Sequence, residues 1–127
     1  KHYKIFCHYL EKEIIVRGTY ELLYAIYLNE NNILWDRPVL NYTRDDGSHH
    51  RYFNDFHLIE SDEFIEIKGR YQDDDKLKMK FVMLSNPDKD IKLLFRSDLD
   101  KLLNIKLYSP EAKRLAQLHL YGDKPFS

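Results

Sequence analysis

Two apolar runs decide the fold of this chain: Tyr52-Phe53-Asn54-Asp55-Phe56-His57-Leu58 and, shortly after it, Phe64-Ile65-Glu66-Ile67-Lys68-Gly69. Both are rich in aromatic and β-branched residues, which is typical of strands. The connection 59–63 is short enough for a hairpin. We therefore expect the two strands to pair and to bring Asp55 beside Glu66.

The second run carries a lysine on the same face as its glutamate. Side chains of a strand alternate between faces, so Glu66 and Lys68 point one way while Ile65 and Ile67 point the other. The expected result is a cluster of two acids and one amine on an otherwise apolar sheet. One alternative stays open: Asp55 lies in a turn, and the other two residues form an ordinary exposed pair.

Two neighbouring carboxylates repel each other, and their burial is unfavourable unless a cation lies between them. Mg²⁺ prefers oxygen ligands and keeps several waters, so it suits such a pair. We expect Asp55, Glu66 and the backbone carbonyl of Ile67 to hold the ion. Lys68 would then activate a water and stabilise a phosphate, which are the needs of phosphodiester hydrolysis.

Four short segments appear in an order that is more specific than any one of them. They are Gly18-Thr19-Tyr20-Glu21, Asn54-Asp55, Ile65-Glu66-Ile67-Lys68-Gly69 and Asp73-Asp74-Asp75-Lys76. Together they resemble the PD-(D/E)xK nuclease superfamily, and within it the phage and intron-encoded endonucleases of homing type. The resemblance extends from about Val16 to Phe81.

The resemblance implies a restriction-endonuclease-like fold and a DNA endonuclease that depends on Mg²⁺, with Mn²⁺ as the alternative ion. It also implies that Glu21 assists metal binding, that Asp55 and Glu66 are ligands, and that Lys68 is catalytic. Asn54 stands where the family usually has proline. Two other functions stay open: a DNA repair or junction-resolving nuclease of the same fold, and a non-catalytic DNA-binding module.

Glu21 has a second explanation that does not involve a metal. Thr19 is a good N-cap, and apolar residues recur at helical spacing over 19–30, so Glu21 falls in the first turn of a helix. A carboxylate there is favoured by the helix dipole alone. The family pattern nevertheless favours the metal-site role.

Composition agrees with one nuclease catalytic domain over 1–127, because 43% of the residues are hydrophobic. No run can span a membrane and no signal pattern is present, so we expect no membrane binding and a location in the phage or bacterial host cytoplasm. Cys7 has no partner for a disulfide and is expected in the core or on the surface. The chain begins at Lys1 rather than methionine, which suggests a trimmed protein that lacks a DNA-recognition module.

The net charge of −1 is not typical of a nucleic-acid-binding protein, but affinity for DNA depends on where the basic residues lie. We expect double-stranded DNA as the partner. The candidate phosphate contacts close to the site in sequence are Arg51, Arg70, Lys76, Lys78 and Lys80. For any one of them, a solvated surface charge is the plainer explanation. A homodimer is expected if both strands are cut, since one such site cleaves one strand.

The spacing of apolar residues and the positions of turn-forming residues predict the remaining helices and strands. Strands are expected near 33–35 and at 39–44, 51–58, 64–68 and 90–95, with a turn at 45–48 and helices at 73–84, 97–103 and 110–120. The helix at 73–84 provides a crossover, so the strand at 90–95 should be parallel to that of Glu66. The fold class is α/β or α+β, with a central mixed sheet flanked by helices.

The histidines and tyrosines are weaker signals. His49 and His50 are adjacent on a strand and point to opposite faces, which spoils chelation, so we expect surface residues. His57 shares a face with Asp55 and would flank the metal, although a half-buried histidine with a hydrogen-bond partner is the safer expectation. For the tyrosines of the helix at 19–30, packing in the core is the first expectation, and stacking on bases is the second.

Overall fold

The computed structural model describes residues 2–107 and 109–118, which form eight strands and four helices. The strands are β1 (His2–Cys7), β2 (Lys12–Arg17), β3 (Trp35–Asp36), β4 (Val39–Thr43), β5 (His49–Phe53), β6 (Phe56–Leu58), β7 (Glu63–Lys68) and β8 (Asp90–Phe95). The helices are α1 (Gly18–Glu30), α2 (Asp73–Ser85), α3 (Arg96–Leu103) and α4 (Pro110–Leu118). No helix among the described residues is long and apolar enough to span a membrane.

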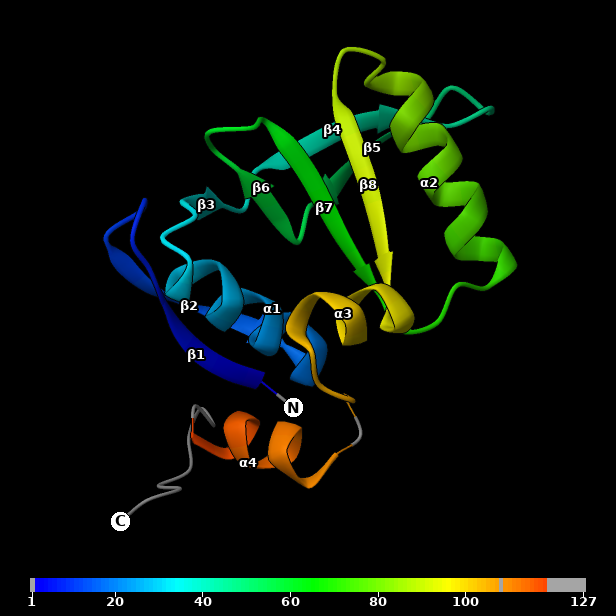
Figure 1. Cartoon of the computed structure of the whole chain (residues 1–127). Helices are drawn as coiled ribbons and strands as arrows, with labels where there is room; N and C mark the ends of the chain where they lie inside the picture. Colours follow the sequence, from blue (N-terminus) through cyan, green and yellow to red (C-terminus); the bar gives the residue numbers. More distant parts are fainter. Residues whose placement is uncertain (1, 108, 119–127) are drawn as a thin grey trace.

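A mixed four-stranded sheet with the order β3-β6-β7-β8 lies at the centre (Figure 1). β7 runs antiparallel to β6 and parallel to β8, and Glu66 is paired with Leu93 of β8. Helix α2 forms the crossover between the two parallel strands, as its position in the sequence predicts. The expected mixed sheet with flanking helices is confirmed.

The two faces of this sheet cover different cores. Ile65 and Ile67 pack with α1 and with Trp35 and Phe56, whose rings meet edge to face at 5.0 Å. Phe64 faces the other way, toward α2 and the β4–β5 hairpin. The alternation of β7 thus places Ile65 and Ile67 in one core, while Phe64, Glu66 and Lys68 lie on the opposite face.

The strand expected at 51–58 is interrupted, which corrects the prediction of one continuous element. β5 ends at Phe53 and pairs with β4, whereas β6 begins at Phe56 and pairs with β7. Asn54 and Asp55 lie between them, and the Asn54 N–H donates to the carbonyl of Pro38 at 3.3 Å. The chain therefore leaves the β4–β5 hairpin and enters the four-stranded sheet at Asn54 and Asp55, where the site is predicted.

The N-terminal third also departs from the prediction. The β1–β2 hairpin, antiparallel from His2 to Arg17, was not predicted. The expected N-cap Thr19 is wrong, because α1 begins at Gly18 and Arg17 occupies the cap without a side-chain hydrogen bond. Gly18 has φ +82°, a left-handed conformation that glycine adopts without strain and that lets β2 turn directly into α1.

Other predicted features agree closely with the structure. The short strand expected at 33–35 lies at Trp35–Asp36, and the helix expected at 110–120 is described to Leu118, so its last two residues lie outside the described residues. Tyr24 is buried in the core, which confirms packing as the first role of the helix tyrosines. Cys7 is also buried there, and its thiol donates to the carbonyl of Trp35.

Candidate active site

Asp55 occupies the break between β5 and β6, where its side chain reaches across to β7. Its Oδ2 accepts a hydrogen bond from the backbone N–H of Ile67 at 2.8 Å. Ile67 lies between Glu66 and Lys68 in the sequence, so the bond ties the first acid directly to the strand of the second. The expected juxtaposition of Asp55 and β7 is therefore present, because the β6–β7 hairpin pairs Phe56 with Ile65 and so brings Asp55, in the break just before β6, beside Glu66.

Glu66 and Lys68 project from the same face of β7 and contact each other. Lys68 Nζ lies 3.2 Å from Glu66 Oε2 and 4.0 Å from Asp75 Oδ1 of α2. Glu66 is only 6% exposed, so this is a buried pair rather than the exposed cross-strand pair of the alternative explanation. Its second oxygen, Oε1, is buried without a hydrogen-bond partner among the described residues.

Glu21 reaches the same region from the first turn of α1. Its Oε1 accepts from the backbone N–H of Arg17 at 3.3 Å and lies 3.4 Å from the guanidinium of Arg37. A cavity of about 470 Å³ opens over this carboxylate and that of Asp55. The residues that line it are Ile15, Arg17, Glu21, Arg37, Phe53, Asn54 and Asp55.

The carboxylates influence each other's protonation. Burial, followed by the charges of Glu66 and Glu21, raises the pKa of Asp55 to about 8. The N–H of Ile67 opposes this shift but does not cancel it. Burial also raises the pKa of Glu21, with Arg37 acting in the opposite direction. Three acids thus share one electrostatic environment that penalises full ionisation.

The oxygen atoms of this site have the chemistry that a divalent cation requires. The buried, unpartnered Glu66 Oε1 and the raised pKa of Asp55 fit a cation, because a positive charge would satisfy the oxygen and relieve the repulsion. Among residues 2–107 and 109–118, no three His, Cys, Asp or Glu side chains already converge as a metal-binding group. The chemistry of the donors fits, and their oxygens are engaged by Ile67, Lys68 and Arg37 instead.

Sequence reasoning missed two polar side chains that support the site. Asn54 is 1% exposed, and its Nδ2 donates to the carbonyl of Ile65 at 3.2 Å. Tyr52 is buried beside it, and burial, together with the Glu66 carboxylate, raises the pKa of its hydroxyl. Asn54 bonds to β7 through its side chain, and its departure from the proline that the resemblance led us to expect was the available signal.

Arg37 is the third residue that sequence reasoning missed. It lies between β3 and β4, and besides its contact with Glu21 it donates from Nη1 to the carbonyl of Ile15 at 2.6 Å. The arginine thereby joins β2 to the start of α1 and adds a positive charge to the cavity. No local pattern marks it, because the loop meets α1 only in the folded chain.

His57 does not flank the site, which corrects one of the two expectations for it. Its ring nitrogens lie 2.7 Å from Asp36 Oδ1 and 2.7 Å from Asp62 Oδ1, on the side of the sheet where β3 pairs with β6. The half-buried histidine with hydrogen-bond partners is confirmed. His49 and His50 are exposed, as expected.

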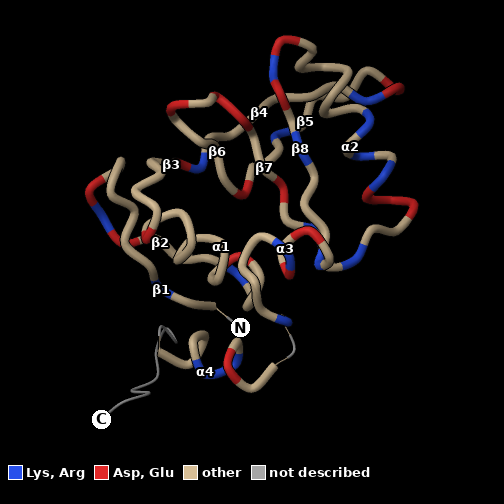
Figure 2. Tube along the Cα trace, in the orientation of Figure 1, with Lys and Arg blue, Asp and Glu red and all other residues tan. Residues whose placement is uncertain are grey.

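The candidate phosphate contacts lie on two surfaces. Arg51 is exposed on β5, and Arg70 is exposed directly after β7. The three lysines follow the acidic first turn of α2, and Figure 2 shows this change from red to blue along the helix. Lys76 and Lys78 lie 5.8 Å and 5.3 Å from the rings of Tyr71 and Tyr52 respectively. Their role in DNA binding stays a prediction.

The fold and the site together define the class of protein: a mixed α+β protein in which three acids and a lysine, with Glu66 buried, gather where β5 leads into the four-stranded sheet. The sequence model of the phage endonuclease I family matches residues 12–110. The chain therefore belongs to the phage endonuclease I family, and this membership indicates a phage-type DNA endonuclease. No curated protein and no solved structure gives a significant match.

Proposed function

We propose that this chain is a Mg²⁺-dependent DNA endonuclease of the PD-(D/E)xK type, with Mn²⁺ as an alternative ion. The observation that carries the proposal is the hydrogen bond from the N–H of Ile67 to Asp55, which holds this acid next to the buried Glu66 and Lys68. Family membership supports the endonuclease class. The metal and the residue roles are the parts that the proposal adds.

In this proposal Asp55, Glu66 and the carbonyl of Ile67 hold the ion, and Glu21 assists from α1. A cation held by these residues would supply Lewis-acid stabilisation of the phosphate and would lower the pKa of a water. Lys68 lies 3.2 Å from Glu66, so its ammonium is placed to stabilise negative charge at the reacting phosphate.

The cavity over Asp55 has the charges that a phosphodiester backbone requires. Arg17 and Arg37 line it together with Glu21 and Asp55. Arg37 already offsets the charge of Glu21, and Arg17 is exposed and available to a phosphate oxygen. DNA would therefore approach between the start of α1 and the end of β5.

Incubation with supercoiled plasmid tests the proposed reaction directly. We expect nicked or linear product with Mg²⁺ and with Mn²⁺, and none with EDTA. Thermal melts at pH 8 supply a second measurement, because binding of a cation to the folded state raises the Tm. Cleavage that proceeds equally in EDTA, or a Tm that does not respond to Mg²⁺, would contradict the metal site.

The same assay separates the remaining candidate functions. Linear duplexes of random sequence, a duplex with a single defined site and a four-way junction distinguish homing-type cleavage from repair or junction resolution. A preparation that binds these substrates and cuts none would support the non-catalytic DNA-binding module. Sedimentation of the purified protein tests the proposed homodimer, which cutting of both strands requires.

A further inference from the structure

The aromatic ring of Phe53, the last residue of β5, is exposed, although the nearby Tyr42 and Tyr52 are buried. Phe53 is 64% exposed and lines the same 470 Å³ cavity as Asp55. Ile15, another exposed apolar side chain, lines that cavity as well. Exposed aromatic and aliphatic side chains beside arginines and carboxylates suit one ligand in particular, a nucleotide with an apolar base and a charged phosphate.

The outer face of the β4–β5 hairpin continues from Phe53 away from the cavity. Its register pairs Val39 with Phe53, Asn41 with Arg51 and Thr43 with His49, so these side chains share one face. The Arg51 guanidinium lies 5.5 Å from the centre of the Phe53 ring. Cationic and aromatic groups therefore meet directly on this face, an arrangement that favours nucleic acid over an apolar protein partner.

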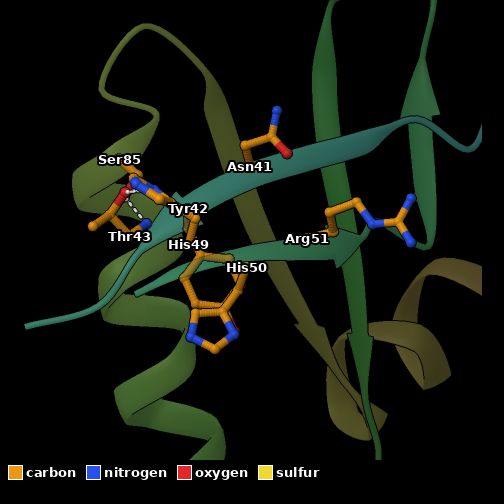
Figure 3. A pocket seen from close by; sticks show the side chains of 7 residues that line it. All are labelled: Asn41, Tyr42, Thr43, His49, His50, Arg51 and Ser85. Atoms are coloured by element: carbon orange, nitrogen blue, oxygen red, sulfur yellow. Dashed lines mark hydrogen bonds between the residues drawn. The ribbon is translucent and has the colours of Figure 1, made fainter. Parts of the chain in front are cut away.

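A second hollow lies farther along the hairpin, with a volume of about 650 Å³ (Figure 3). Its lining contains Arg51, His49 and His50 and no acidic residue. In Figure 3, Arg51 points away from the group formed by His49, Thr43 and Ser85, toward the end of β5. Arg51 thus places one positive charge between this hollow and Phe53, and its charge complements a phosphate of a polyanion.

We propose that Phe53 is a stacking platform for one nucleobase of the DNA strand, next to the phosphate at Asp55, and that Arg51 holds the adjoining backbone. This inference rests on the proposed nuclease function. It adds Phe53 as a residue that orients the bound DNA strand in the site. The base must leave the duplex stack to meet the ring, because paired bases present only their edges. Every base has a π face, so the contact is independent of sequence.

The test uses a single-stranded oligonucleotide that carries 2-aminopurine, whose fluorescence is quenched by stacking. Binding is measured in EDTA and, separately, with Ca²⁺, so the readout does not require cleavage. We expect the wild-type protein to quench the probe, Phe53→Trp to retain the effect, and Phe53→Leu to lose it. Phe53→Ala should bind the oligonucleotide about 5- to 150-fold more weakly.

Phe6→Ala is the matched control. Phe6 is 42% exposed on β1 and lines neither of the two hollows, so its removal should leave quenching and affinity unchanged. Because both rings are exposed, circular dichroism melts should show that both variants fold. Equal losses in the Phe6 and Phe53 variants would overturn the proposal, as would quenching that Phe53→Leu retains.

Two further outcomes separate this inference from the proposed function. If Phe53→Ala cuts plasmid and binds DNA like the wild type, stacking is rejected while the nuclease stands. If quenching depends on Phe53 but no substrate is cut with Mg²⁺, the platform stands and the nuclease is rejected. A wild-type protein that binds no DNA overturns both. Dissociation of a dimer by Phe53→Ala would show that this face is covered by a second copy, and the stacking proposal would fall.

Discussion

The N–H of Ile67 donates to Asp55 Oδ2 at 2.8 Å, so a backbone group of β7 positions an acid that precedes it by 12 residues in the sequence. Glu66 and Lys68 flank Ile67 on the strand. One hydrogen bond therefore sets the relative position of all three candidate residues. A backbone donor cannot be removed by side-chain substitution, which makes this part of the site resistant to local repacking.

Asp55→Asn and Glu66→Gln should each abolish plasmid cleavage while the protein remains folded. Each change removes a negative ligand and relieves repulsion among the acids, so the free energy of unfolding should stay the same or rise. Cleavage rate and a urea melt are measured for each variant. A folded double variant that nicks plasmid at the wild-type rate would refute the assignment.

Lys68→Met should slow cleavage by orders of magnitude and leave Mg²⁺ affinity nearly unchanged. In the proposed mechanism the ammonium acts on the phosphate and the water, and its removal adds no repulsion to the cation. Calorimetry measures the affinity, and Lys89→Met, which removes only an exposed pair with Asp88, is the matched control. Metal affinity that falls as far as in Glu66→Gln would assign Lys68 a different role.

Glu21→Gln should weaken Mg²⁺ activation and slow cleavage, since Glu21 lines the cavity with Asp55. If Glu21 only complements the helix dipole, the change should cost a few tenths to about 1 kcal/mol of stability and leave turnover intact. The Mg²⁺ concentration at half-maximal cleavage rate separates the metal-site role of Glu21 from the helix-dipole role. Glu13→Gln, an exposed acid paired with Lys4 on β1, should change neither quantity.

Metal-free stability should fall as pH rises from about 4 to about 8. The unfolded Asp55 releases its proton near pH ~4, whereas burial and the neighbouring acids raise its pKa to about 8 in the folded protein. The folded state therefore binds more protons in this interval, and stability decreases with pH. Urea melts in EDTA at a series of pH values measure how steeply the free energy of unfolding falls with pH, and this dependence should be shallower in Asp55→Asn. Identical slopes would mean that Asp55 ionises normally.

Asn54→Ala should destabilise the protein by about 1–3 kcal/mol, because the carbonyl of Ile65 loses its bond to Nδ2 in a buried setting. Cleavage should also slow, since Asn54 fixes the break that carries Asp55. The matched control is Asn31→Ala, whose Nδ2 bonds to the carbonyl of Tyr27 at an exposed position. Unchanged stability would show that the amide of Asn54 does not hold the two sheets together.

Local pattern was sufficient for the elements whose partners are near in sequence. The alternation of β7 placed Glu66 and Lys68 on one face, and the helical period of α1 placed Glu21 in a first turn. The crossover length predicted that β8 is parallel to β7. Each of these properties depends on side-chain period or on the length and type of the connection between two elements, which can be read directly from the sequence.

The sequence by itself thus determined the mixed sheet, its flanking helices and the candidate acids and lysine. Only the tertiary structure decided that the chain breaks at Asn54 and Asp55, that Arg37 meets Glu21, and that His57 faces Asp36 and Asp62. Strand pairing and ion pairing between distant residues depend on which surfaces the folded chain brings together. Such contacts leave no periodic trace in the sequence, because their energy is gained only when both partners are already in place.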